Sequence, residues 1–179
     1  MGGGTLDHTI AVIQGEYRIS DDPNALLSTI LGSCVAVCLH DSVRKIGGMN
    51  HFLLPYGQEQ GESRPVRYGL FAMEQLINAL MKGGARKANL QAKVFGGAKI
   101  TADLRDIGAT NAQFAHQFLA NEGVQILGES LGGTNARRVV FRPATGHARL
   151  LIVPSSTVAQ TETLPRRPPP PKTNDIELF

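Results

Sequence analysis

The chain of 179 residues contains no tryptophan and only two cysteines, and aromatic residues make up just 6% of it. Two cysteines are too few for the disulfide framework of a small secreted protein. We therefore expect both thiols to be reduced and the protein to be cytoplasmic. Hydrophobic residues make up 42% of the chain, so a sizeable core is expected, and it must be mostly aliphatic.

Long apolar runs and concentrated charge are also absent. No stretch is apolar over the length of a membrane span, and the N-terminus lacks the charged-then-apolar order of a signal peptide. The net charge is +3, but Lys and Arg are scattered, apart from small clusters at Arg137 and Arg138 and at Arg166 and Arg167. Nucleic-acid-binding modules more often carry a basic stripe with interleaved aromatics. The sequence favours neither membrane insertion nor a nucleic-acid partner.

Residues 1–154 are expected to form a single domain. After Pro154 the chain becomes rich in Ser, Thr and Pro, and it includes the run "RRPPPP". Such a composition cannot bury enough apolar surface to fold, so residues 155–179 are predicted to be a disordered tail.

Apolar periodicity predicts a mixture of strands and helices. Helices are expected over residues 66–82 and 107–123. Strands are expected over residues 9–14, 35–40, 46–55 and 90–98, and a final meander over 124–133, 137–143 and 147–154. "ISDDPNALL" is read as a polar turn. Predicted buried helical positions are Leu70, Met73, Leu76, Ile77, Leu80 and Met81 in the first helix and Phe114, Phe118 and Leu119 in the second.

Two helices cannot cover both faces of a sheet of about seven strands. The predicted fold class is therefore α/β, a layered α/β sandwich with a mainly antiparallel sheet and two principal helices. The second face of the sheet must be covered by something other than helix, such as further sheet.

The segment from Thr29 to Pro55 gathers most of the reactive side chains. It holds both cysteines, Cys34 and Cys38, and two of the five histidines, His40 and His51. Most of its other residues are apolar or glycine, which is typical of a buried hairpin.

A hairpin would bring two of these groups together. If the two apolar runs pair through a loop at residues 42–43, Asp41 lies opposite Arg44 and, by the same register, Cys34 lies opposite His51. Directly opposite residues share one face of a sheet, with Cβ atoms about 4.5–5.5 Å apart. A loop longer by an odd number of residues would move one of them to the other face.

A thiol beside an imidazole is a recognised catalytic pair. The imidazolium lowers the pKa of the thiol, and the resulting thiolate is a nucleophile. The histidine can then return the proton to a leaving group. Cys34 and His51 are the candidates for these two roles.

The residues just before Cys34 could support the same chemistry. Gly32 and Ser33 let the chain turn sharply, and their backbone N–H groups could form an oxyanion hole. A third group should hold the imidazole in one tautomer. The hydroxyls of Ser28 and Thr29 are candidates, as is a backbone carbonyl.

Other interpretations of the segment stay open at this point. Cys34, Cys38 and His51 could simply be core residues, because free cysteine is among the most buried residue types. A metal site is disfavoured, since cysteines four apart on a strand lie two pleat repeats from each other. The same distance argues against a disulfide. His40 is read as solvent-exposed.

Two glycine-rich strips, residues 95–98 and 131–133, have two readings. They could flank a cleft and let a substrate approach, or they could be turns that need positive φ, which is the favoured reading. Asn111 is interpreted as a helix N-cap.

Several blocks of the sequence resemble the CheD family, the chemoreceptor glutamine deamidases. They are "LGSCVAVCLHD" followed by "GGMNHFLLP", then "RYG", "AKVFGGA", "IGATN" and "ESLGG", and finally "RRVVFRPATG", in the family's order. The resemblance spans residues 9–153. It implies hydrolysis of glutamine side-chain amides in methyl-accepting chemotaxis receptors, without metal or organic cofactor, on an α/β sandwich similar to that of deamidating toxins.

The resemblance also implies roles for particular residues. Cys34 matches the family's nucleophile and His51 its histidine. The third member is a hydroxyl five or six residues before the cysteine, which is Thr29 or Ser28 here, with Thr29 favoured by residue type. Cys38 matches a packing position.

The resemblance leaves two further possibilities. Some family members bind CheC-type phosphatases, so such a partner is possible beside the receptors. A non-catalytic adaptor on the same scaffold is the alternative function, although an adaptor need not keep both Cys34 and His51.

Overall fold

The computed structural model describes residues 6–55, 63–100, 106–154 and 156. The predicted disordered tail lies outside these residues, apart from Ser156. The elements are β1 (His8–Ala11), β2 (Tyr17–Ser20), β3 (Ala25–Leu31), β4 (Val35–Asp41), β5 (Ile46–Asn50), α1 (Ser63–Lys82), a 3-10 turn (Lys87–Asn89), β6 (Leu90–Gly96), α2 (Ile107–Asn121), β7 (Gln125–Leu131), β8 (Ala136–Arg142) and β9 (His147–Val153).

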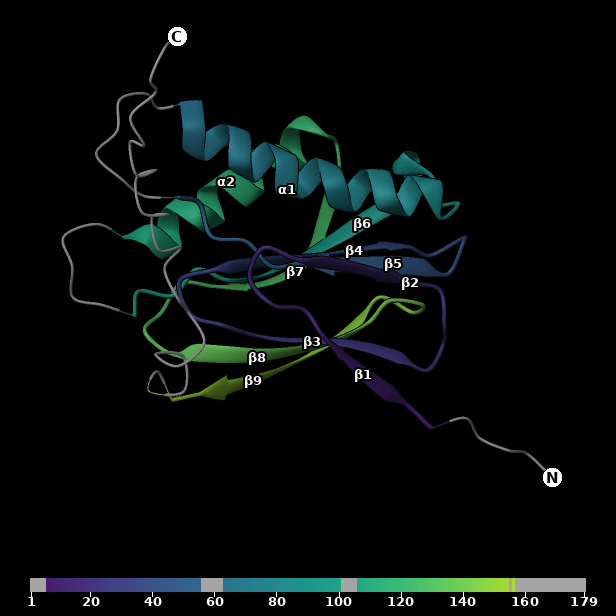
Figure 1. Ribbon diagram of the computed structural model, residues 1–179, viewed down its shortest axis with the longest axis horizontal. Helices are drawn as coiled ribbons and strands as arrows, with labels where there is room; N and C mark the ends of the chain where they lie inside the picture. The colour runs from purple at the N-terminus through teal and green to yellow at the C-terminus, as the bar shows by residue number, and fades with distance from the viewer. Residues whose placement is uncertain (1–5, 56–62, 101–105, 155, 157–179) are drawn as a thin grey trace, which may run out of the picture.

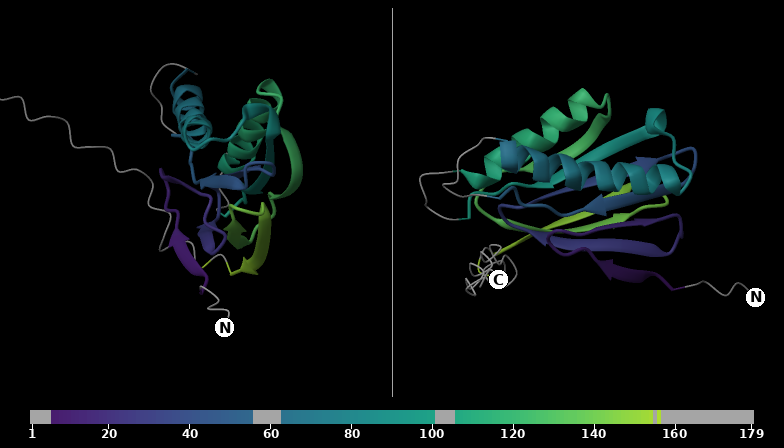
Figure 2. Two further views of the ribbon diagram at one scale, coloured as in Figure 1. Left: turned by 90° about the vertical axis from the view of Figure 1, so that its right-hand side faces the viewer. Right: turned by 45° about the horizontal axis from the view of Figure 1, so that its top comes forward.

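Within the described residues, the strands form two sheets. One has the order β2-β5-β4-β6-β7 and the other β1-β3-β8-β9. Helices α1 and α2 pack on one face of the five-stranded sheet, and the four-stranded sheet lies on its other side, which gives three layers (Figure 1 and Figure 2). Pairing is parallel for β1 with β3 and for β6 with β7, and antiparallel for the remaining neighbours. The predicted layered, mainly antiparallel α/β sandwich is confirmed, including further sheet on the second face.

Strand β4 lies at the centre of these layers and is buried on both faces. Val35, Val37 and Leu39 belong to the core between the five-stranded sheet and the helices. Ala36 and Cys38 belong to the core between the two sheets. Since successive side chains of a strand point to opposite faces, one apolar run supplies both cores.

The β4–β5 hairpin forms, but the predicted register is wrong. Asp41 pairs with Ile46 and not with Arg44, so the loop covers residues 42–45. The Asp41 side chain accepts hydrogen bonds from the backbone N–H groups of Val43 and Arg44 at 2.9 Å each. Lys45 then takes φ 58° and donates its N–H to the Asp41 carbonyl. The loop is longer by two residues, an even number, so Cys34 and His51 stay on one face although they are not directly opposite.

The predicted C-terminal meander is also wrong. Strand β7 pairs with β6 in parallel in the five-stranded sheet, whereas β8 and β9 form a hairpin in the four-stranded sheet. Gly132 and Gly133, both with positive φ, turn the chain from one sheet to the other. The segment read as a polar turn, residues 19–27, includes the last two residues of β2, which pairs with β5, and the first three residues of β3.

Helix α1 buries most of its predicted stripe. Met73, Leu76 and Leu80 are fully buried, but Leu70 and Met81 are 37% and 47% exposed, which corrects the prediction for these two. They lie at the margin of the apolar stripe, where a helix packed on a sheet leaves side chains in solvent. No helix of the described residues is long and apolar enough to cross a membrane.

Candidate active site

Thr29 and His51 are in contact, and Cys34 lies near them because its neighbour Val35 pairs with Phe52, the residue after His51. Thr29 belongs to β3 of the four-stranded sheet, Cys34 directly precedes β4, and His51 directly follows β5. All three are buried, with exposed fractions of 7%, 0% and 5%. The site is therefore built from strand ends of both sheets, in the water-poor layer between them.

The hydrogen bonds of Thr29 fix the tautomer of His51. Thr29 Oγ1 lies 2.7 Å from the carbonyl oxygen of Val12 and 2.9 Å from His51 Nδ1. The carbonyl can only accept, so the single hydroxyl proton points to Val12, and Nδ1 must donate to Oγ1. His51 Nδ1 also lies 3.3 Å from the same carbonyl oxygen, which again requires a proton on Nδ1. The basic lone pair of neutral His51 is therefore on Nε2.

Of the two predicted hydroxyls, the structure places Thr29 and not Ser28 against His51. Strand β3 alternates between buried and half-buried positions, and Thr29 is on its buried face. Ser28 is half-buried and points to the opposite face, as alternation requires. The face of β3 therefore decides which of the two hydroxyls contacts His51.

The segment that carries Cys34 is held by its carbonyl groups. The Gly32 carbonyl accepts from Ala98 N–H and the Cys34 carbonyl from Gly97 N–H, both at 2.8 Å. The Ser33 carbonyl accepts from Asn111 Nδ2 at 2.9 Å. The carbonyls of three successive residues are thus held by donors from α2 and from the end of β6 and the residues that follow it.

Asn111 is a site residue whose position was predicted wrongly. It lies inside α2, fully buried, and the N-cap is Asp106, whose side chain accepts from Ala109 N–H. Asn111 Oδ1 accepts a hydrogen bond from Leu54 N–H at 3.0 Å, and Asn111 Nδ2 donates to the Ser33 carbonyl. A signal was present, because Asn111 falls four residues before Ala115 on the apolar stripe of the helix.

The glycine strip at 95–98 borders the segment that carries Cys34. Gly96 and Gly97 have φ of 112° and 63°, which confirms the turn interpretation. A Cβ on Gly96 would lie 2.1 Å from the Cys34 carbonyl oxygen. The strip therefore also permits the close approach that positions Cys34. In the other strip, Gly132 and Gly133 likewise have positive φ.

The two cysteines have different surroundings, and neither forms a disulfide. Cys38 packs in the core between the sheets, where burial raises the pKa of its thiol. His40 is buried and not exposed as predicted, because its Nδ1 donates to the Pro143 carbonyl at 2.8 Å. In the described part of the chain, no three His, Cys, Asp or Glu side chains gather as metal ligands would.

Gln14 is a second residue that sequence reasoning missed. Cys34 Sγ donates to its side-chain oxygen Oε1 at 3.5 Å. Gln14 is half-buried and lies between β1 and β2, and nothing in the periodicity of that segment points to it.

Comparison with known proteins identifies a family model and several relatives that match the chain. The family model described as "CheD chemotactic sensory transduction" matches residues 53–151, a range that begins just after His51. A relative named "Probable chemoreceptor glutamine deamidase CheD" from Caulobacter vibrioides is 47% identical over 95% of this chain and 92% of its own. One of the same name from Rhizobium leguminosarum is 48% identical over 95% of both chains.

Among solved structures, Bacillus licheniformis YfiH is similar with a TM-score of 0.44 and 17% identity, over 64% of this chain and 49% of that one. A likeness this distant supports no statement about function. The match to the family model and the near full-length relatives are decisive, and the chain belongs to the CheD family.

Proposed function

We propose that this protein hydrolyses the side-chain amide of glutamines in chemotaxis receptors, giving glutamate and ammonia, and that it acts in the cytoplasm. The observation that carries the proposal is the Thr29–His51 hydrogen bond of 2.9 Å beside buried Cys34. The relatives named as chemoreceptor glutamine deamidases share nearly half of the sequence over almost its whole length. We assign the activity to residues 1–154.

In the first half of the reaction, Cys34 is the nucleophile. His51 Nε2 accepts the thiol proton, and the thiolate attacks the carbonyl carbon of the glutamine side chain. The tetrahedral intermediate collapses as the nitrogen takes the proton from His51 and leaves as ammonia. A thioester between Cys34 and the substrate remains.

In the second half, His51 is a general base toward water. The resulting hydroxide equivalent attacks the thioester carbon, and the thiolate leaves and is reprotonated. The products are a glutamate side chain and the starting enzyme. The chain's own residues perform each proton transfer, so this scheme uses no cofactor.

The oxyanion of both intermediates needs donors near Cys34. The Gly32 and Ser33 carbonyls are held by Ala98 and Asn111. In a trans peptide the N–H points opposite to the carbonyl of the same unit. We assign the oxyanion to the N–H side of these two peptides, those of Ser33 and Cys34.

Chemoreceptors are the protein partners that this function requires. A CheC-type phosphatase is a second partner that we propose from the family resemblance alone. A non-catalytic adaptor would bind a receptor without changing its mass, so the two functions differ in a measurable product.

Mass spectrometry of a receptor cytoplasmic fragment tests the proposal. Each hydrolysed glutamine adds about one dalton and releases one ammonia, as amide-to-acid conversion requires. The wild-type protein should produce this shift and Cys34→Ala should not. Cys38→Ala is the matched control, since it removes the other buried thiol, and it should retain the activity. If wild type and Cys34→Ala leave the same unshifted receptor mass, the deamidase function is wrong.

A further inference from the structure

The side chain in contact with Cys34 carries the functional group of the proposed substrate. Gln14 Oε1 accepts a hydrogen bond from Cys34 Sγ at 3.5 Å, and Cys34 has no exposed surface. The chain thus presents a primary carboxamide of its own to its proposed nucleophile.

We propose that Gln14 is a substrate mimic in cis, whose carboxamide occupies the subsite for the glutamine carboxamide and must leave before a receptor glutamine can reach Cys34. This inference rests on the proposed function and adds a subsite and a competing group to it. We call this blocking contact the cap. Only molecules in which the Gln14 side chain has left Cys34 bind substrate, so Gln14 sets the fraction of molecules that is competent for binding.

The geometry of the contact indicates that Gln14 is a cap and not a substrate. Its carbonyl oxygen faces Cys34 Sγ as a hydrogen-bond acceptor. Attack would instead require the carbonyl carbon to face the sulfur, with the oxygen directed at oxyanion-hole donors. Gln14 is therefore held in an unproductive orientation.

Opening requires the side chain of Gln14 to move and not its backbone. On one side, Val12 N–H donates to the Ser28 carbonyl at 2.9 Å. On the other, Gly15 N–H donates to the His51 carbonyl at 2.8 Å and His51 N–H donates to the Glu16 carbonyl at 3.0 Å. These bonds also hold His51, so a moving backbone would disturb the base. Rotation about the side-chain bonds of Gln14 breaks the hydrogen bond with Cys34 and leaves these backbone hydrogen bonds in place.

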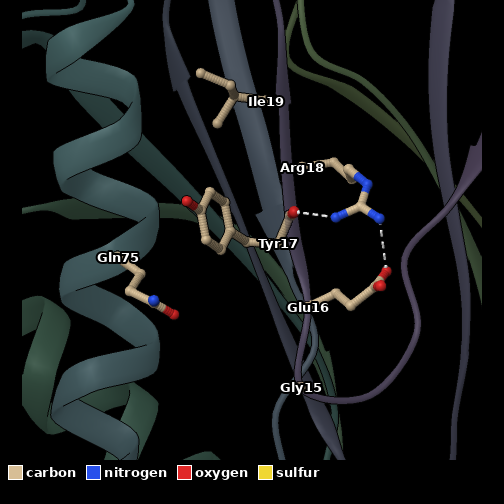
Figure 3. A pocket seen from close by; sticks show the side chains of 6 residues that line it. All are labelled: Gly15, Glu16, Tyr17, Arg18, Ile19 and Gln75. Carbon is tan, nitrogen blue, oxygen red and sulfur yellow. Dashed lines mark hydrogen bonds and ion pairs between the residues drawn. The ribbon is translucent and has the colours of Figure 1, made fainter.

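A surface depression begins directly after Gln14. Its lining residues come from the start of the β2 region and from α1: Gly15, Glu16, Tyr17, Arg18, Ile19 and Gln75 (Figure 3). At its Gly15 end it joins the backbone that is bonded to His51. The side chains of Tyr17 and Ile19 lie on the side of β2 that faces α1, and the 3.1 Å ion pair between Arg18 and Glu16 lies on the other side (Figure 3). Gln14 is not among these lining residues, so the depression adjoins the Gln14 position and does not contain it.

Alkylation of Cys34 by iodoacetamide tests the cap without any receptor. The full chain is labelled, and peptide mapping separates Cys34 from Cys38. Gln14→Ala and Gln14→Met, which keeps the length but lacks the carbonyl, should label Cys34 about threefold to tenfold faster than wild type, the range expected for one neutral hydrogen bond. Gln91→Ala, a half-buried glutamine at the far end of β6, is the matched control and should label at the wild-type rate.

Kinetics with the receptor fragment give the second test. Gln14→Ala should lower KM by the same factor and leave kcat unchanged, because a cap competes with substrate and takes no part in the chemistry.

Three results would overturn the cap. They are Cys34 labelling that is unchanged or slower in both Gln14 variants, a lower kcat at constant KM, and conversion of Gln14 to glutamate in wild type. Faster labelling in the variants, combined with no receptor deamidation by wild type, would leave the cap standing and reject the proposed function.

Discussion

The hydroxyl of Thr29 is the smallest feature on which the proposed chemistry depends. It accepts from His51 Nδ1 because its own proton is committed to the Val12 carbonyl. That arrangement leaves Nε2 as the base, which is the nitrogen that the reaction needs. Without the hydroxyl the ring loses a partner that fixes both its tautomer and its orientation.

Thr29→Ala should lower kcat of receptor deamidation about a hundredfold, within the range that a positioned acid–base group contributes. Thr29→Ser keeps the hydroxyl and should restore most of this loss. Ser28→Ala is the matched control and should retain the wild-type kcat, since Ser28 is on the other face of β3. Initial rates of ammonia release measure all three. A loss in Ser28→Ala that exceeds the loss in Thr29→Ala would contradict the assignment.

At the scale of elements, helix α2 positions the peptide that precedes Cys34, the proposed nucleophile. Asn111 links Ser33 to Leu54 and so joins the Cys34 segment to the segment that follows His51. The bond from Leu54 is buried and the bond to Ser33 is partly buried, where a hydrogen bond is stronger than in water and its loss is costly. Asn111 is therefore a positioning residue for the proposed oxyanion hole.

Asn111→Ala should lower kcat of deamidation about tenfold to a hundredfold, somewhat less than the loss of an oxyanion-hole donor itself. Alkylation of Cys34 passes through no oxyanion, so its rate should change far less than kcat does. Asn50→Ala is the control for stability. Asn50 is also a buried asparagine whose side chain accepts a backbone hydrogen bond, in its case from Val37 N–H at 2.9 Å. Equal losses in kcat and in alkylation rate would mean that Asn111 has only a structural role.

Strand β4 also carries a histidine that couples stability to pH. Burial lowers the pKa of His40 from its usual 6.5, while the hydrogen bond to the Pro143 carbonyl acts in the opposite direction. The unfolded chain then binds more protons than the folded one below pH 6.5, so the unfolding free energy falls as the pH drops from 6.5 through the folded-state pKa.

Urea unfolding at several pH values measures this dependence. His40→Gln should reduce the loss of stability below pH 6.5. His147→Gln, at an exposed histidine, should leave it as in wild type. If both variants follow the wild-type curve, His40 does not cause the acid sensitivity.

At the scale of the whole molecule, a buried arginine joins the two sheets beside the site. Arg137 belongs to β8 of the four-stranded sheet and is 4% exposed. Its guanidinium donates at 2.6 Å to the carbonyls of Gly96 and Ser130, in β6 and β7 of the other sheet, and at 2.5 Å to that of Gly132. Gly96 in turn packs against the Cys34 carbonyl, so this link reaches the nucleophile segment.

Arg137→Met should therefore lower the unfolding free energy by about 2–4 kcal/mol, because several buried carbonyls lose a charged donor. The neighbouring Arg138→Met is the matched control, since that side chain is exposed, and should change stability by less than about 0.5 kcal/mol. Chemical denaturation of the three proteins compares them. Equal stability of Arg137→Met and wild type would show that the link contributes nothing.

The sequence by itself determined the features that depend on local pattern. The apolar run of β4 indicated a strand buried on both faces, and the helices were readable from their apolar stripes. Cys34 and His51 share a face because the actual loop differs from the expected one by an even number of residues. These features follow from the spacing of apolar residues, which repeats every two residues in a strand and every 3.6 residues in a helix and can be read from the sequence.

Only the tertiary structure decided the features that depend on contacts between distant segments. The choice of Thr29 over Ser28 needed the second sheet, since it is the face of β3 that meets His51. Asn111 bonds the Ser33 carbonyl from 78 positions away along the chain, and Gln14 bonds Cys34 from 20 positions away. In the sequence Arg137 was only one of two adjacent arginines, and its burial follows from the packing of the two sheets. No local period encodes such contacts, because burial and hydrogen-bond partners arise only when the layers pack together.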